Sequence, residues 1–150
     1  MNLNFENARE LMVKNQLRPN KIKESVILNL FQTIPKEDFV PERIKNICYN
    51  DNNLNILENR GYLKNLHLAQ IIDNSNINKN DTVMHIGGLT GYLSTIISKM
   101  CKKLVILEEN EYAYLSLNEN LKYYNINNAE IIKNELNIGC VEKAPFDLIV

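Results

Sequence analysis

The sequence predicts an α/β fold in which a helical N-terminal part precedes an alternating series of strands and helices. Apolar residues recur at helical spacing through the first half of the chain, whereas the second half contains short continuous apolar runs. The clearest of these runs, residues 82–86, follows turn-forming residues and leads at once into a glycine-rich turn and a new helical pattern. Strands that alternate with helices pair in parallel, so we expect one parallel sheet.

Length and composition indicate one soluble domain. The chain has 150 residues, of which 45% are hydrophobic and 23% charged, as is usual for globular proteins. A net charge of -1 provides no electrostatic attraction to nucleic acid or to an anionic membrane. No apolar run is long enough for a signal peptide or a bilayer span.

The cysteines indicate a reducing compartment, and we expect the cytoplasm. Cys48, Cys101 and Cys140 are far apart and odd in number. Their spacing suggests neither a metal site nor a disulfide framework, so each is expected to be a small buried hydrophobic residue.

Residues 1–75 are expected to form a helical cap and a loop that contributes to a binding site. Apolar helical faces and helix-breaking residues divide this part into segments. The expected segments are helices over residues 4–16, 21–33, 42–48 and 65–74, a short turn or helical element over 36–41, and a long polar loop over 49–61. The second helix should end at Ile34, because a residue before proline is pushed out of the helical region. Long loops often carry function.

Residues 76–150 are expected to form the sheet. Apolar runs predict strands over residues 82–86, 103–107, 129–133 and 146–150, with helices over 92–100 and 111–124 between them. We predict the spatial strand order 3-2-1-4, and right-handed crossovers then place both helices on the same face.

Candidate ligand-binding residues gather after the first two strands of this sheet. Gly87, Gly88 and Gly91 would let the backbone approach a ligand closely. Glu108 ends the second strand, where nucleotide-binding folds hold a ribose through its hydroxyls. The glycines also fit a tight connection without a ligand, and Glu108 also fits a solvated carboxylate at a strand end.

Several motifs in the same order resemble the protein-L-isoaspartate O-methyltransferase family over nearly the whole chain. They lie at residues 8–19, 34–41, 49–51, 87–92, 105–108 and 144–147, and the proline-flanked segment 34–41 is the most specific. The resemblance implies a Rossmann-like methyltransferase parallel sheet, here of about four strands, with an N-terminal helical cap. The family sheet has seven strands, so we expect a chain truncated at its C-terminus.

The resemblance also implies a reaction and a site. The family transfers a methyl group from S-adenosylmethionine to the α-carboxylate of an isoaspartyl residue in a damaged protein, which starts its repair. By likeness, Gly87, Gly88 and Gly91 would approach the methionine part of the cofactor and Glu108 would bind the ribose. Glu135 stands where the family usually has an aspartate near the adenine.

Three residues depart from the family pattern. His85 replaces an acidic residue, and we expect it to be a hydrogen-bonded core histidine. Leu89 replaces the middle glycine of the turn, and Leu63 replaces a serine of the substrate loop, so the catalytic residue is unknown. Arg60, Lys64 and His67 are the nearby side chains that offer a cation or a donor.

Three hypotheses follow from these residues. In an enzyme with an altered acceptor, Leu89 should have a negative φ and turn its side chain into the core, which leaves the cofactor site open. In a non-catalytic relative that acts as a binding or scaffolding module, Leu89 should fill that site. The third is a nicotinamide-dependent domain with Glu108 on the ribose, although such domains begin near their first strand.

Overall fold

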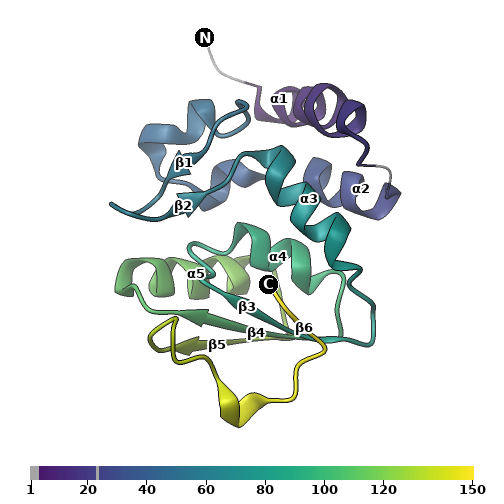
Figure 1. Cartoon of the computed structure of the whole chain (residues 1–150). Coiled ribbons are helices and arrows are strands. Elements are labelled where there is room, and N and C mark those ends of the chain that lie inside the picture. Colours follow the sequence, from purple (N-terminus) through teal and green to yellow (C-terminus); the bar gives the residue numbers. More distant parts are fainter. Residues whose placement is uncertain (1–3, 23) are drawn as a thin grey trace. The chain divides into compact units, whose positions relative to one another are not determined.

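The computed structural model of the chain describes residues 4–22 and 24–150 (Figure 1). The chain divides into two compact units, Met1–Asn74 and Ser75–Val150. The organisation as a single domain stays a prediction.

The first unit is helical, as expected. Its elements are α1 (Phe5–Met12), the π-helical turn η1 (Val13–Leu17), the 3₁₀ turns η2 (Arg18–Asn20), η3 (Lys36–Phe39) and η4 (Glu42–Ile47), α2 (Ser25–Thr33), the strands β1 (Leu54–Asn55) and β2 (Gly61–Tyr62), and α3 (Asn65–Ser75). The expected start of the second helix at Lys21 is wrong. Lys21 has a left-handed φ of 67° and ends the preceding turn, so α2 begins only at Ser25; Lys23 lies outside the described residues.

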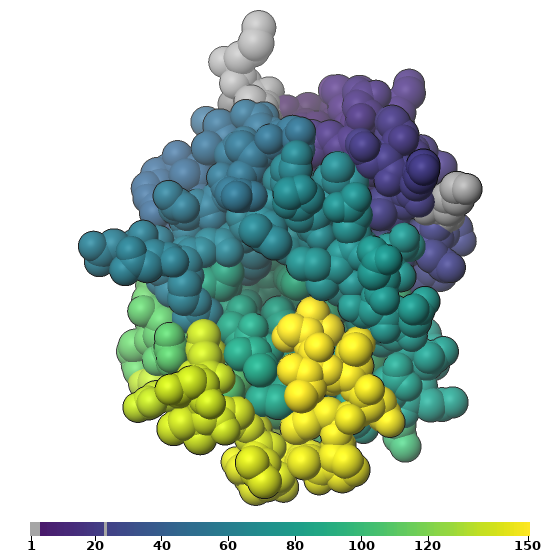
Figure 2. All heavy atoms as spheres, viewed as in Figure 1, coloured from purple at the N-terminus to yellow at the C-terminus, as the bar shows by residue number. Residues whose placement is uncertain are grey.

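The loop expected over residues 49–61 contains a small hairpin that the sequence did not predict. β1 and β2 pair antiparallel, with Leu54 opposite Tyr62. The N–H groups of Ile56 and Leu57 both donate to the Arg60 carbonyl, at 3.2 and 2.8 Å, and close the tip. The tip projects from the surface of this unit (Figure 2). Strands of two residues are too short to show an alternating apolar pattern.

The second unit has the expected parallel sheet. Its elements are β3 (Thr82–Ile86), α4 (Tyr92–Ser98), β4 (Lys103–Glu108), α5 (Glu111–Tyr123), β5 (Ala129–Lys133), the 3₁₀ turn η5 (Val141–Lys143) and β6 (Leu148–Ile149). Within residues 75–150, all of which are described, the order β5-β4-β3-β6 and the parallel pairing of every neighbour confirm the predicted 3-2-1-4 arrangement. The last strand is shorter than expected, although its ladder hydrogen bonds continue to Val150.

Both faces of the two central strands are covered, which explains why these strands are mostly apolar. α4 and α5 lie together on one face, as right-handed crossovers require (Figure 1). On the other face, Met84, Val105 and Leu107 pack with Cys140. Each fully buried side chain of this size contributes about 1.5–3 kcal/mol. The core therefore holds β3 and β4 rigidly and fixes where their carboxyl ends lie.

Among the described residues, no helix combines the length and the apolar character needed to cross a membrane.

The hairpin depends on the absence of a side chain at Gly61. A Cβ atom there would lie 1.9 Å from the Leu54 carbonyl oxygen, which belongs to the paired backbone and cannot move aside cheaply. We expect Gly61→Ala to lower the free energy of unfolding by about 3 kcal/mol, at the upper end for overpacking. Gly139→Ala is the control: it meets no atom within 4 Å and adds only the strain of a φ of 72°, about 1 kcal/mol. Urea unfolding of both variants measures the difference, and equal losses would contradict the steric account.

Candidate active site

The turn after β3 keeps the backbone shape of a glycine turn. Gly87, Leu89 and Gly91 all have left-handed φ angles, of 80°, 49° and 99°. A Cβ atom on Gly88 would lie 2.4 Å from Ile106 Cγ2, and one on Gly91 would lie 2.7 Å from a Leu117 methyl group. A side chain at either position would displace Ile106 or Leu117, so these two glycines let the turn pack closely on β4 and α5. Their presence is explained without a ligand.

Leu89 contradicts the expectation of a negative φ. The chain reverses between β3 and α4 within five residues, and the middle of this turn adopts the left-handed region even with leucine in place of glycine. That conformation costs about 1–2 kcal/mol for an ordinary residue. Burial of the Leu89 side chain and a hydrogen bond from its N–H to Glu108 Oε2, at 2.8 Å, offset the cost.

Glu108 is fully buried, with 0% of its surface exposed. Its carboxylate accepts hydrogen bonds from the backbone N–H groups of Leu89 at 2.8 Å, Glu109 at 3.0 Å and Asn110 at 2.9 Å. Hydrogen bonds to a charged group are stronger than neutral ones and compensate its removal from water. In this structure, Glu108 anchors the turn to the end of β4.

A second acid, Glu109, joins the end of β4 to the loop after β5. Glu109 Oε2 accepts a hydrogen bond from the Leu136 N–H at 3.1 Å, and Leu136 follows the exposed Glu135. The loops after β3, β4 and β5 therefore meet at the carboxyl edge of the sheet. This edge is where open α/β sheets bind ligands. The sequence placed Gly87, Gly88, Gly91, Glu108 and Glu135 at this edge, and the structure brings all five there.

His85 is a buried, hydrogen-bonded histidine, which confirms the expectation. Its Nδ1 lies 2.8 Å from the Ser94 hydroxyl, on the helix that follows the turn. Burial lowers the pKa of His85 to about 4, and the charge of Glu108 opposes this only in part. The ring is neutral at physiological pH and supplies no negative charge where the family has an acid.

In the first unit, the residues expected at the substrate loop lie around the end of β2. Leu63 is 40% exposed. The Lys64 N–H donates to Asn53 Oδ1 at 2.9 Å, and its ammonium pairs with Asp51 at 3.2 Å. His67 is exposed on α3, and Arg60 closes the hairpin tip through its carbonyl. Of the three candidate side chains, Lys64 is the cation adjacent to Leu63, and Asp51 holds it across the loop.

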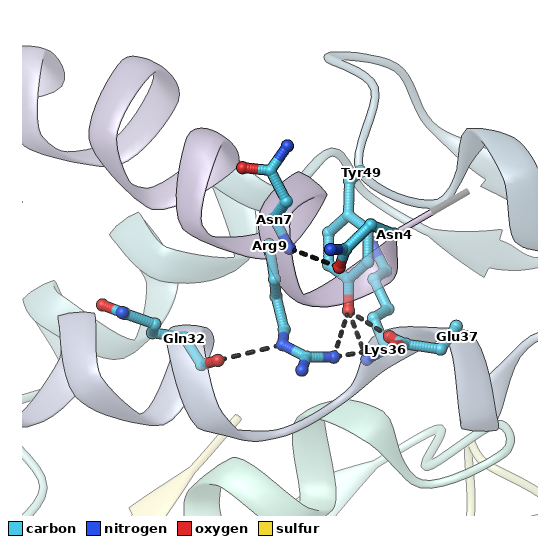
Figure 3. Close-up of polar contacts among 7 residues, drawn as sticks. All are labelled: Asn4, Asn7, Arg9, Gln32, Lys36, Glu37 and Tyr49. Atoms are coloured by element: carbon cyan, nitrogen blue, oxygen red, sulfur yellow. Dashed lines mark hydrogen bonds and ion pairs between the residues drawn. The ribbon is translucent and has the colours of Figure 1, made fainter. Parts of the chain in front are cut away.

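A buried polar cluster in the first unit was missed by sequence reasoning. The Tyr49 hydroxyl is the point where three residues converge (Figure 3): it accepts hydrogen bonds from Arg9 Nη1 at 3.3 Å and the Lys36 N–H at 2.9 Å, and it donates to Glu37. Glu37 also pairs with Arg9 at 2.7 Å. Burial lowers the pKa of Lys36 to about 8. The charged residues Lys36 and Glu37 stand between apolar residues in a proline-flanked segment, and this was the signal that the sequence offered.

The parallel sheet, the glycine-type turn after β3 and the acid at the end of β4 together define a Rossmann-like methyltransferase fold. Residues 6–150 match the family described as protein-L-isoaspartate(D-aspartate) O-methyltransferase. The chain belongs to this family.

Known members of the family are distant in sequence. Protein-L-isoaspartate O-methyltransferase 2 of Pelobacter propionicus is 26% identical over 147 residues, which cover 98% of this chain and 65% of that protein. The enzyme of Methanoculleus marisnigri is 28% identical over 142 residues, covering 95% of this chain and 64% of that protein. The chain thus spans less than two thirds of the length of these relatives.

Solved structures share the fold. A protein-L-isoaspartate O-methyltransferase superposes with a TM-score of 0.77 at 22% identity, over 94% of this chain and 46% of the other. A Plasmodium falciparum protein assigned to the same enzyme, solved with S-adenosyl-L-homocysteine, superposes with a TM-score of 0.73 at 18% identity, over 94% of this chain and 71% of the other.

The depressed pKa of His85 makes stability depend on pH. Between pH 4 and pH 6.5 the unfolded chain binds a proton that the folded chain does not, so the free energy of unfolding falls as the pH falls through this window. The loss attributable to His85 should reach about 3 kcal/mol at pH 4. Urea unfolding of the wild type and of His85→Gln at pH 7 and pH 4.5 measures it, because the glutamine variant lacks the titration. An imidazole that titrates near pH 6.5 in the folded protein would contradict the burial argument.

Proposed function

We propose that this chain is part of an S-adenosylmethionine-dependent carboxyl methyltransferase that acts on isoaspartyl residues of proteins. The observation that carries the proposal is the carboxyl edge of the sheet. The turn between β3 and α4 is joined through the Leu89 N–H to a carboxylate at the end of β4. Open α/β sheets bind ligands at this edge, although Leu89 has a left-handed φ and not the negative φ expected of an enzyme.

The candidate residues suit the chemical groups of the cofactor. We assign Gly87, Gly88 and Gly91 to the methionine part, Glu108 to the ribose hydroxyls and Glu135 to the adenine amine. Carboxylates accept hydrogen bonds from hydroxyl and amine donors. Since Glu108 is buried, a ribose hydroxyl would reach its carboxylate only if the turn at Leu89 moves. The exposed Glu135 needs no such movement.

Little chemical assistance is required from the protein. The cofactor supplies an electrophilic methyl group on its sulfonium. An acceptor carboxylate, with a pKa near 4, is already ionised at neutral pH and needs no general base. Leu63 in place of a serine therefore removes a positioning contact and not a catalytic proton transfer. Lys64, held by Asp51, is the cation we assign to the acceptor carboxylate.

The relatives support the assignment. Both curated relatives are named protein-L-isoaspartate O-methyltransferases, and one solved relative of the fold contains S-adenosyl-L-homocysteine, the product that remains after the cofactor loses its methyl group. The expected partner is a protein or peptide with an isoaspartyl residue. The expected compartment is the cytoplasm, where the buried thiols of Cys48, Cys101 and Cys140 stay reduced.

A second candidate function is a non-catalytic relative that keeps the fold as a binding module. The turn after β3 favours it: Leu89 lacks the negative φ expected of an enzyme, and the Glu108 carboxylate is fully buried and already bound by three backbone N–H groups. His85, neutral where the family has an acid, points the same way.

Cofactor binding separates the two candidates. In an enzyme, Glu108→Ala should weaken S-adenosylmethionine binding by about 1.5–3 kcal/mol, because hydrogen bonds to a charged group are lost. Glu119→Ala, an exposed acid on α5, is the control and should leave affinity unchanged. Isothermal calorimetry on the full chain measures both. Unchanged affinity in Glu108→Ala would remove Glu108 from the site, and no binding by the wild type would favour the binding module.

Activity is tested by transfer of a labelled methyl group to an isoaspartyl peptide, to its aspartyl isomer and to a mixed protein extract. We expect base-labile label on the isoaspartyl peptide, as for a methyl ester. Transfer to the extract alone would indicate another acceptor. No transfer to any of the three would exclude the enzyme.

A further inference from the structure

The loop of residues 49–62 is held at both ends by one residue, Lys36. At the first end, the Lys36 N–H donates to the Tyr49 hydroxyl at 2.9 Å (Figure 3). At the other end, Lys36 Nζ donates to Asn65 Oδ1 at 2.7 Å and lies 5.7 Å from the centre of the Tyr62 ring. The Asn65 amide also donates to the Cys48 carbonyl at 3.3 Å and thereby closes the ring of contacts.

The first end of this loop is tied further into the helical unit. The Tyr49 hydroxyl donates to Glu37, which pairs with Arg9 on α1. The Tyr49 carbonyl accepts a hydrogen bond from Gln16 at 2.7 Å. Movement of either end would therefore break hydrogen bonds between buried groups, which costs about 1–3 kcal/mol for each group left unsatisfied.

Packing alone does not account for a lysine at this position. Lys36 is completely buried, with 0% of its surface exposed. An apolar side chain of similar length would fill the space without the cost of removing an amine from water. What the amine adds is direction, because its hydrogen bond fixes Asn65 and its charge favours the face of Tyr62.

The segment that Lys36 fixes carries the groups assigned to the acceptor. Leu63 and Lys64 lie directly between Tyr62 and Asn65, the two residues that the Lys36 amine contacts. Asp51, which holds the Lys64 ammonium, follows Tyr49 by two residues. The relative position of Asp51 and Lys64 thus depends on both ends of the loop being fixed.

We propose that Lys36 is a positioning residue for acceptor binding, which sets the loop 49–62 and the Asp51–Lys64 pair so that the Lys64 ammonium receives the carboxylate of an isoaspartyl peptide. This inference rests on the proposed function. It names Lys36, which touches neither the acceptor nor the cofactor, as a determinant of acceptor affinity.

The test compares Lys36→Met with Lys14→Met, an exposed lysine of the same unit, in the full chain. Hydrogen–deuterium exchange reports the loop amides of residues 50–62 directly. Steady-state kinetics with an isoaspartyl peptide gives KM and kcat, and calorimetry gives the affinity for S-adenosylmethionine. Tyr49→Phe, which removes the hydroxyl at the other end of the loop, serves as the second variant if Lys36→Met does not fold.

We expect Lys36→Met to speed exchange of the loop amides and to raise KM for the peptide, each about tenfold, as for the loss of one buried hydrogen bond. The kcat, the cofactor affinity and exchange in β3 and β4 should stay within about twofold, and Lys14→Met should match the wild type. A merely structural role would change kcat, cofactor affinity and KM together.

Three other outcomes would overturn the inference, and each identifies the step that fails. Unchanged loop exchange in Lys36→Met would show that Lys36 does not fix the loop, whatever the kinetics. Faster loop exchange with an unchanged KM would show that loop order does not govern acceptor binding. If the wild type transfers no methyl group to the peptide, the proposed function fails, and the acceptor role of Lys36 fails with it.

Discussion

The buried carboxylate of Glu108 is the interaction on which the second unit depends most. It ends β4 in the interior, where an isolated charge would be costly, and three backbone N–H groups compensate that cost. One of them belongs to Leu89, in the turn after the neighbouring strand. The same carboxylate therefore caps the end of β4, through the N–H groups of Glu109 and Asn110, and holds the adjacent turn through the Leu89 N–H. Glu109 does the equivalent for the loop after β5, through the Leu136 N–H.

This constraint explains how the turn tolerates leucine in place of glycine. A left-handed leucine is strained, yet its N–H is directed at a full negative charge, and its side chain is buried. The backbone of the site has the left-handed φ angles of a glycine turn, while His85 is neutral and Glu108 accepts hydrogen bonds from the protein itself. A ligand reaches Glu108 only when the buried turn moves, which couples binding to the conformation of the turn.

The first unit also buries charged groups and compensates them with hydrogen bonds. The side chains of Glu37 and Arg9 meet at the Tyr49 hydroxyl, and Lys36 donates its backbone N–H to the same hydroxyl and its ammonium to Asn65. Such a cluster adds little net stability, because removing the charges from water costs about as much as their contacts return. Its effect is to specify one arrangement of the loop 49–62. In both units, buried charge determines the geometry of a loop that carries candidate binding groups.

The sequence by itself determined the parallel sheet, the face that its helices cover and the residues gathered at its carboxyl edge, because apolar periodicity and crossover handedness are local or topological rules. It also identified His85 as a core histidine. Only the tertiary structure decided the φ of Leu89, the burial of Glu108, the β1–β2 hairpin and the cluster around Lys36. Each of these depends on which backbone N–H or side chain lies opposite, as Leu89 does on Glu108 across 19 residues. Such contacts arise from packing between distant segments, and no pattern of neighbouring residues contains them.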